Sequence, residues 1–156
     1  MKEDTVRYKF ADTDNIEEAQ DIRLEMLRTV NGLPADYEYD KSFISATRDY
    51  FINGDQITVL AADDDNEVIG CATMSYIAVM PTFSHPTGKR AHLMNVYVRE
   101  KYRRKGIAAE MVELLIEDAG RRGATEVSLD ATPMGRPLYE KLGFKASEEC
   151  MTLKTD

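Results

Sequence analysis

The sequence predicts a single mixed α/β domain built around one β-sheet. Its 156 residues are enough to bury one core without support from disulfides or metals. Runs that alternate like strands are interleaved with runs that repeat at helical spacing, which is typical of helices packed in layers on a sheet. No internal repeat or low-complexity tract marks a second unit, so we expect one domain over residues 1–156.

The first third of the chain predicts one strand followed by two helices. Residues 6–10 alternate as a short strand does, and a broad apolar stripe predicts a helix over about residues 15–29. The sequence Asn31-Gly32-Leu33-Pro34 ends this helix. A second helix is expected over about residues 41–52, ending at Asn53-Gly54.

The middle of the chain predicts three neighbouring strands. Residues 57–62 and 68–79 are apolar runs joined by an acidic turn, as in an antiparallel hairpin. The turn departs from a calcium loop, because Val68 replaces the required glycine and Met74 the bidentate acid. After a loop over residues 80–90, residues 92–98 predict a central strand. Its alternation places Met94, Val96 and Val98 on one face and Leu93, Asn95 and Tyr97 on the other.

The last third predicts a long helix, a strand, a short helix and a final strand. Apolar residues recur at helical spacing from Ile107 onward, and Arg121-Arg122 before Gly123 suits a helix C-terminus. A strand is expected over residues 126–131 and a short helix over residues 137–142, with Pro137 in its first turn. Residues 145–153 are expected to form the last strand.

Composition and charge exclude several classes of function. The formal net charge of −8 argues against nucleic acid as a partner, because phosphate backbones require a basic surface. No apolar run is long enough to span a bilayer. The N-terminus, Met1-Lys2-Glu3-Asp4-Thr5, lacks the apolar core of a signal peptide, so we expect a cytoplasmic protein. Cys71 and Cys150 lack metal-site spacing, and we expect reduced thiols and no metal.

A basic segment at the start of the long helix stands out against this acidic background. A helix N-terminus offers unpaired N–H groups and partial positive charge, so it can bind phosphate through the backbone. Gly106 permits close approach of a ligand, and Ala108 keeps the next position small. Arg103, Arg104 and Lys105 add positive charge. The spacing matches neither a Walker loop nor a dinucleotide fingerprint, and a solvated basic helix start is the alternative.

Two motifs together resemble the GCN5-related N-acetyltransferase (GNAT) family. They are Val96-Tyr97-Val98 followed by Arg103-x-x-Gly106-x-Ala108, and Leu138-Tyr139-Glu140-Lys141-Leu142-Gly143-Phe144 about thirty residues later. The resemblance implies a GNAT-like mixed, mostly antiparallel sheet flanked by helices, in which two central strands splay apart and admit acetyl-CoA. It also implies acetyl transfer to an amine by direct attack in a ternary complex.

The resemblance assigns donor-binding roles to two segments. The backbone amides of Arg104, Lys105, Gly106, Ile107 and Ala108 and the side chain of Arg103 would hold the pyrophosphate of acetyl-CoA. Val96 and Val98 would offer backbone groups to the pantetheine arm. A bulge in this strand would direct an amide, at Val96 or its neighbour, toward the acetyl oxygen, where negative charge develops.

The resemblance also nominates an acid and a base. Tyr139 would donate a proton to the departing thiolate, whereas its alternative role is a core tyrosine under the short helix. Asp130 is the first candidate for the base that deprotonates the amine. A water chain through Asn95 is the second candidate, and His92 is the third.

The acceptor is the least defined part of this prediction. We expect a primary amine on a small cationic or amino-acid-like molecule. A protein N-terminus or lysine is one alternative, and a non-catalytic acyl-CoA-binding regulatory module is another. Members of the family are often homodimers, although no surface of this sequence indicates which face would pair.

Overall fold

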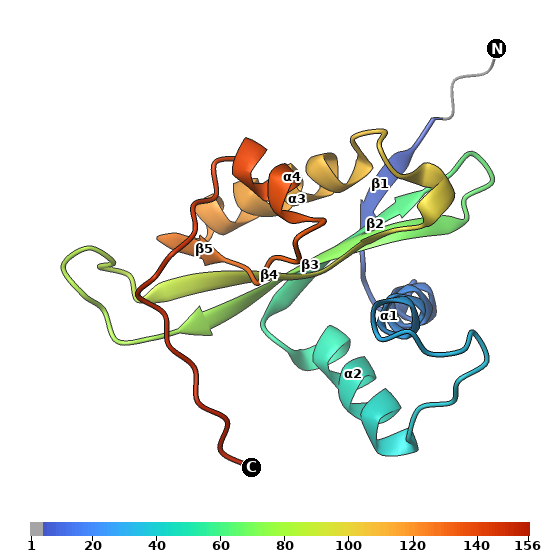
Figure 1. The fold of residues 1–156 in the computed structure, drawn as a ribbon, viewed down its shortest axis with the longest axis horizontal. Helices are drawn as coiled ribbons and strands as arrows, with labels where there is room; N and C mark the ends of the chain where they lie inside the picture. The colour runs from blue at the N-terminus through green and yellow to red at the C-terminus, as the bar shows by residue number, and fades with distance from the viewer. Residues whose placement is uncertain (1–4) are drawn as a thin grey trace.

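The computed structural model describes residues 5–156 and shows a five-stranded sheet with helices on both faces (Figure 1). The strands lie in the order β1-β2-β3-β4-β5 and are antiparallel except for the parallel pair β4 and β5. Their bounds are Arg7–Phe10, Gln56–Ala62, Val68–Ala78, Lys89–Val98 and Glu126–Ser128. The predicted α/β fold with a mostly antiparallel sheet is therefore confirmed.

The helices form two layers on opposite faces of the sheet. Figure 1 shows α1 (Ile16–Val30) and α2 (Lys41–Asn53) on one face, and α3 (Ile107–Arg121) and α4 (Arg136–Lys141) on the other. A 3-10 turn, η1 (Glu100–Tyr102), connects β4 to the segment that precedes α3. Each helix lies within a few residues of its prediction, because apolar spacing and the Gly and Pro stops are local signals.

The C-terminal prediction was wrong in two places. β5 ends at Ser128 and does not continue to Ala131. Residues 145–153 form no strand, since the chain there has no neighbouring strand to pair with. Met151 and Leu153 are 93% and 87% exposed, so alternation in this segment buries no apolar surface. The mixed-charge stretch Met1–Asp4 lies outside the described residues.

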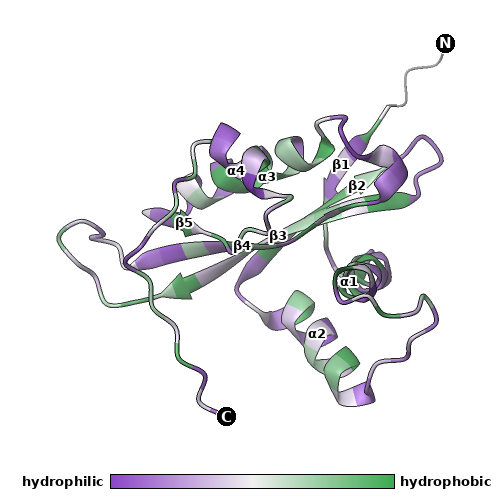
Figure 2. Ribbon diagram, in the orientation of Figure 1, coloured by the Kyte–Doolittle hydropathy of each residue, from purple (hydrophilic) through white to green (hydrophobic). Residues whose placement is uncertain are grey.

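The main core lies between the sheet and α3. Met111 and Leu115 of α3 and Met74 of β3 are fully buried there. A smaller cluster, which includes Ile22 and Leu60, lies under α1. Figure 2 shows hydrophobic residues along β2 and β3 and hydrophilic residues in the turn that joins them. α2 contributes no buried residue, so its packing on the sheet is the loosest of the three long helices.

Two further properties concern the described part of the chain. None of the helices within residues 5–156 combines the length and apolar content needed to cross a membrane. Over the same residues, no group of three or more His, Cys, Asp or Glu side chains is arranged to hold a metal ion.

Candidate active site

The two parallel strands β4 and β5 separate after a short paired stretch. They pair only at Arg90 with Glu126, Ala91 with Val127 and His92 with Ser128. β4 then continues to Val98 with no strand of residues 5–156 on that edge. The predicted splay is therefore present, and it leaves a gap beside the second half of β4.

A β-bulge interrupts β4 beside this gap. Tyr97 is opposite Cys71, whereas Met94 is opposite Thr73, so β4 contains one residue more than β3 over this interval. Asn95 adopts φ 58°, a left-handed conformation that asparagine tolerates better than most residues. The bulge implied by the family resemblance is therefore present, with Asn95 as its left-handed residue.

The bulge changes which side chains of β4 share a face. Leu93, Val96 and Val98 belong to the core under α3, whereas Met94 and Asn95 line a cavity under α2. The prediction that Met94 shares a face with Val96 and Val98 was therefore wrong. An inserted residue reverses the alternation that a regular strand maintains.

The backbone of β4 presents unused groups to the gap. Arg99 donates its N–H to Ile69 O of β3 (2.9 Å), so the odd-numbered residues here point their backbone toward β3. Val96 and Val98 therefore point theirs toward the open edge. The Val98 carbonyl already accepts a hydrogen bond from Arg103 Nε (2.8 Å), which leaves the N–H of Val98 and both groups of Val96 for a ligand.

The segment before α3 forms a turn whose amides gather at the helix N-terminus. Arg104 and Gly106 adopt φ 65° and 80°, which reverses the chain just before Ile107. The first helical hydrogen bond runs from Glu110 N–H to Gly106 O (3.1 Å), so Ile107, Ala108 and Ala109 have no helical acceptor. A Cβ on Gly106 would meet no atom within 4 Å, so this turn has room for an anion to approach. The geometry fits a phosphate-bearing ligand.

The side chain of Arg103 has a structural role as well. Its Nε donates to Val98 O, and its guanidinium lies 5.9 Å from the centre of the Tyr97 ring. Arg103 therefore fastens the turn to the end of β4. Its terminal nitrogens are the part of the side chain that remains for an anion.

Tyr139 occupies a confined position on α4. Its ring packs edge-on against Phe144 at 5.9 Å, and a Cβ at Gly135 would lie only 3.3 Å from its Cε2 atom. Burial raises the pKa of Tyr139, which keeps the phenol protonated at neutral pH. Within residues 5–156 its hydroxyl has no hydrogen-bond partner. A fixed, protonated and unpaired phenol suits a proton donor.

The structure brings two candidates for the base together. Asp130 Oδ2 lies 3.7 Å from His92 Nε2, and His92 Nδ1 is 2.8 Å from Ser128 Oγ. Asp130 is fully exposed in the loop after β5, whereas His92 is partly buried. His92 lies two residues before Met94 on the same strand, β4.

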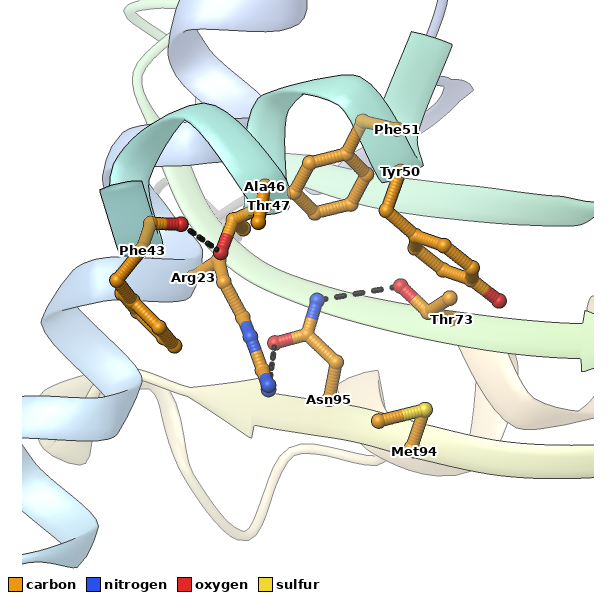
Figure 3. A pocket seen from close by; sticks show the side chains of 9 residues that line it. All are labelled: Arg23, Phe43, Ala46, Thr47, Tyr50, Phe51, Thr73, Met94 and Asn95. Atoms are coloured by element: carbon orange, nitrogen blue, oxygen red, sulfur yellow. Dashed lines mark hydrogen bonds between the residues drawn. The ribbon is translucent and has the colours of Figure 1, made fainter. Parts of the chain in front are cut away.

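A cavity of about 230 Å³ lies between α2 and the sheet (Figure 3). Its floor is formed by Thr73, Met94 and the bulge residue Asn95. Its walls come from α1 and α2 and comprise Arg23, Phe43, Ala46, Thr47, Tyr50 and Phe51. The sequence interpretation nominated none of these wall residues for binding the acceptor. No local motif marks them, because they converge only through the packing of α1 and α2 on β4.

A one-way chain of hydrogen bonds holds Asn95 in the cavity floor. Asn95 Nδ2 donates to Thr73 Oγ1 (3.1 Å), and Thr73 lies 2.7 Å from the hydroxyl of Thr58. Thr58 donates to Gln56 Oε1 (2.7 Å), so Thr73 must donate to Thr58. Gln56 in turn donates to Phe51 O (2.9 Å). The chain leaves Asn95 Oδ1 facing the cavity, where it accepts a hydrogen bond from Arg23 Nη1 (3.3 Å).

This chain has a parallel strand pair that separates, a bulge beside the gap and a turn with free amides before α3. These features together indicate an acetyltransferase. The sequence profile of the acetyltransferase (GNAT) family matches residues 18–144. The chain belongs to this family.

Named relatives are similar over part of their length. A glucosamine 6-phosphate N-acetyltransferase of Trypanosoma brucei brucei is 31% identical over 86 residues, which are 55% of this chain and 56% of that protein. The enzyme of the same name from Arabidopsis thaliana is 29% identical over 116 residues, 74% of each chain. The match to the trypanosomal protein thus spans little more than half its length.

Solved structures agree over nearly the whole chain. A predicted acetyltransferase of Clostridium acetobutylicum, solved with acetyl-CoA, superposes with a TM-score of 0.83 and 27% identity over 96% of both chains. The aminoglycoside N-acetyltransferase AAC(6')-Iy, solved with CoA, has a TM-score of 0.76 at 15% identity and covers 99% of this chain and 97% of its own. At that identity the second likeness concerns the fold alone.

Proposed function

We propose that this protein transfers an acetyl group from acetyl-CoA to a primary amine of a small molecule, by direct attack in a ternary complex. The bulge at Asn95 carries the proposal. Its side chain lines the cavity on the α2 face, while the backbone of neighbouring Val96 faces the open gap beside β4. Donor and acceptor would therefore meet at the consecutive residues Asn95 and Val96 of β4.

The donor would lie along the gap and end at the N-terminus of α3. Amides of the segment from Arg104 to Ala108, including Lys105, would hold the pyrophosphate, with the terminal nitrogens of Arg103 beside them. The backbone groups of Val96 and the N–H of Val98 would hold the pantetheine arm. The neighbour from Clostridium acetobutylicum, solved with acetyl-CoA at a TM-score of 0.83, supports this choice of donor.

Bound acetyl-CoA would supply a thioester whose acetyl carbon the amine attacks, forming a C–N bond as the C–S bond breaks. The Val96 N–H would donate a hydrogen bond to the acetyl oxygen as negative charge develops there. Tyr139 would give its phenol proton to the departing sulfur, so that CoA leaves as a thiol. The amine proton would pass to the pair formed by His92 and Asp130, with Asp130 nearest to solvent.

The cavity favours a small-molecule acceptor over a protein N-terminus or lysine. Its volume of about 230 Å³ suits a molecule the size of an amino acid. The two relatives named as glucosamine 6-phosphate N-acetyltransferases are consistent with a small amine. A non-catalytic acyl-CoA-binding module is the alternative, although it would not require the confined phenol of Tyr139. The cytoplasmic location and a homodimer stay predictions.

The test is acetyl-CoA consumption across a panel of small amines by the full chain and two pairs of variants. Tyr139→Phe should lower kcat roughly 100-fold while acetyl-CoA still raises the melting temperature. Its matched control is Tyr8→Phe on the far strand β1, which should retain full turnover. Gly106→Trp should abolish both acetyl-CoA binding and turnover. Gly120→Trp is its control, because it places the same side chain in open space at the other end of α3.

Three results would contradict the proposal. If acetyl-CoA does not stabilise the unmodified chain, the donor site is wrong. If acetyl-CoA stabilises it but no amine in the panel is acetylated, the binding-module alternative is favoured. If Tyr139→Phe turns over as fast as Tyr8→Phe, the phenol is not the acid.

A further inference from the structure

Arg23 places an unpaired positive charge in the wall of the cavity. Its only hydrogen bond within residues 5–156 goes to the neutral amide of Asn95, and it forms no ion pair with an acidic residue there. Burial lowers the pKa of Arg23, since the guanidinium loses solvent without gaining a carboxylate. Partly buried charges are normally paired, so this site lacks an anion that a ligand can supply.

The remaining donors of the cavity are already used by the protein. The Tyr50 hydroxyl donates to Ser75 Oγ (2.6 Å), and the Thr47 hydroxyl donates to Phe43 O (2.9 Å). The hydroxyl of Thr73 donates to Thr58, as the hydrogen-bond chain requires. Arg23 is therefore the one charged donor of this lining that can bind an anion.

The rest of the lining is mainly apolar and contains no acidic side chain. Phe43, Ala46, Phe51 and Met94 supply hydrocarbon surface next to the guanidinium (Figure 3). A polycationic amine would meet a positive charge in this cavity and would find no carboxylate to pair with. An apolar group on the acceptor would instead bury its surface against the two phenylalanine rings.

The anion site lies immediately beside the reaction point. Arg23 hydrogen-bonds to Asn95, the bulge residue, and the adjacent Val96 carries the proposed oxyanion donor. A small acceptor whose anionic group contacts Arg23 would therefore direct its amine toward Val96. A carboxylate on an apolar amine fits this mainly apolar cavity better than a phosphorylated sugar, whose hydroxyl groups would find few free partners here.

We propose that the acceptor is an apolar α-amino acid, or a compound that likewise combines an amine, a carboxylate and an apolar group, and that Arg23 binds its carboxylate. This inference rests on the proposed acetyl transfer and names its substrate class. The acetylated nitrogen is the α-amine, and the apolar side chain packs between α2 and β4. The cavity thus favours the amino-acid-like part of the sequence prediction over the cationic part.

The test compares acceptors that differ in one group. L-phenylalanine carries the carboxylate, L-phenylalaninamide replaces it with a neutral amide, and glucosamine 6-phosphate and spermidine represent the competing classes. The unmodified chain should acetylate L-phenylalanine with the lowest KM of the four. Arg23→Met should raise that KM roughly 10- to 100-fold and raise the KM for L-phenylalaninamide by a much smaller factor.

Two further variants keep the result interpretable. Arg48→Met removes an exposed arginine of α2 that pairs with Glu17 outside the cavity, and it should change neither substrate. Arg23→Lys retains the charge but loses the planar fork, so a KM between those of the unmodified chain and Arg23→Met is expected. If Arg23→Met fails to fold, the KM for L-phenylalanine is compared between Arg23→Lys and Arg48→Met. A higher KM in Arg23→Lys alone shows that Arg23 binds the carboxylate.

Several outcomes would overturn the inference. L-phenylalaninamide used as well as L-phenylalanine would remove the need for an anion. Preference for spermidine would exclude an anionic acceptor, and preference for glucosamine 6-phosphate would exclude an apolar carboxylate even if Arg23 is required. No turnover of any of the four would also reject the class. If acetyl-CoA then stabilises the unmodified chain but not Gly106→Trp, the proposed donor site is supported even though the acceptor class is wrong.

Discussion

The two faces of the sheet differ in how they are built. On the α3 face, a continuous core fixes the helix, and the predicted donor contacts come mainly from backbone groups of β4 and the turn before α3. On the α1 and α2 face, α2 buries no residue, and the cavity is lined mainly by side chains. A site formed by backbone groups can keep its ligand when side chains change. A site formed by side chains can bind a different ligand when those side chains are substituted. The donor is therefore recognisable from a motif, and the acceptor is not.

The largest expected effect tests whether the two faces differ in stability. Leu115→Ala removes a fully buried side chain under α3 and should lower the free energy of unfolding by about 2–5 kcal/mol. Phe43→Ala, at a 40% exposed side chain of α2, should cost less than about 1 kcal/mol. Urea denaturation followed by circular dichroism measures both. Equal losses would show that α2 is anchored as firmly as α3.

The next effect tests whether the bulge serves catalysis. Asn95→Val places a β-branched residue at φ 58°, so the bulge should rearrange and kcat should fall about 100- to 1,000-fold as the oxyanion donor is misplaced. Asn95→Gly loses the amide but accepts the same φ, and it should recover much of kcat. Steady-state kinetics on acetyl-CoA and the best acceptor measures each value.

The control for this effect is a second left-handed asparagine. Asn66 adopts φ 62° in the exposed turn between β2 and β3. Asn66→Val should cost similar stability and leave kcat unchanged. If Asn95→Gly is as slow as Asn95→Val, the side chain rather than the backbone bulge carries the effect.

The smallest effect concerns the thiol beneath α1. Burial raises the pKa of Cys71 from 9.0 to about 12, so the folded state keeps the proton after the unfolded chain has lost it. This contribution to stability is complete below pH 9 and is lost between pH 9 and 12. Between pH 8 and pH 10 the unmodified chain should therefore lose about 1 kcal/mol more than Cys71→Ala. Parallel pH slopes in urea denaturation would mean that the thiol is not held protonated.

Sequence patterns predicted the elements well where the signals are local. Apolar spacing located α1 and α3, and Gly106 with its basic neighbours located the turn that the structure shows to be open to a ligand. The failures involve partners distant in the chain. The strand expected over residues 145–153 has no neighbour to pair with, and the alternation in β4 could not reveal one extra residue relative to β3.

The candidate site divides in the same way. Tyr139 and the segment from Arg103 to Ala108 follow from motifs whose residues are close in sequence. Arg23 and Asn95 are 72 positions apart. The sequence nominated Asn95 only as part of a water chain to the base, and it did not nominate Arg23. Their contact depends on how α1 crosses β4, which is a property of tertiary packing rather than of local sequence.

Asn95 belongs to both faces of the sheet, and this has an evolutionary consequence. Its backbone shapes the bulge beside the donor, while its amide holds Arg23 in the acceptor cavity. If the cavity binds the acceptor, substitutions on α2 should change the choice of acceptor alone. A substitution at Asn95 should change the choice of acceptor and the turnover together, so its effect should depend on which residues form the walls. We expect this position to be the main source of epistasis in the divergence of the enzyme.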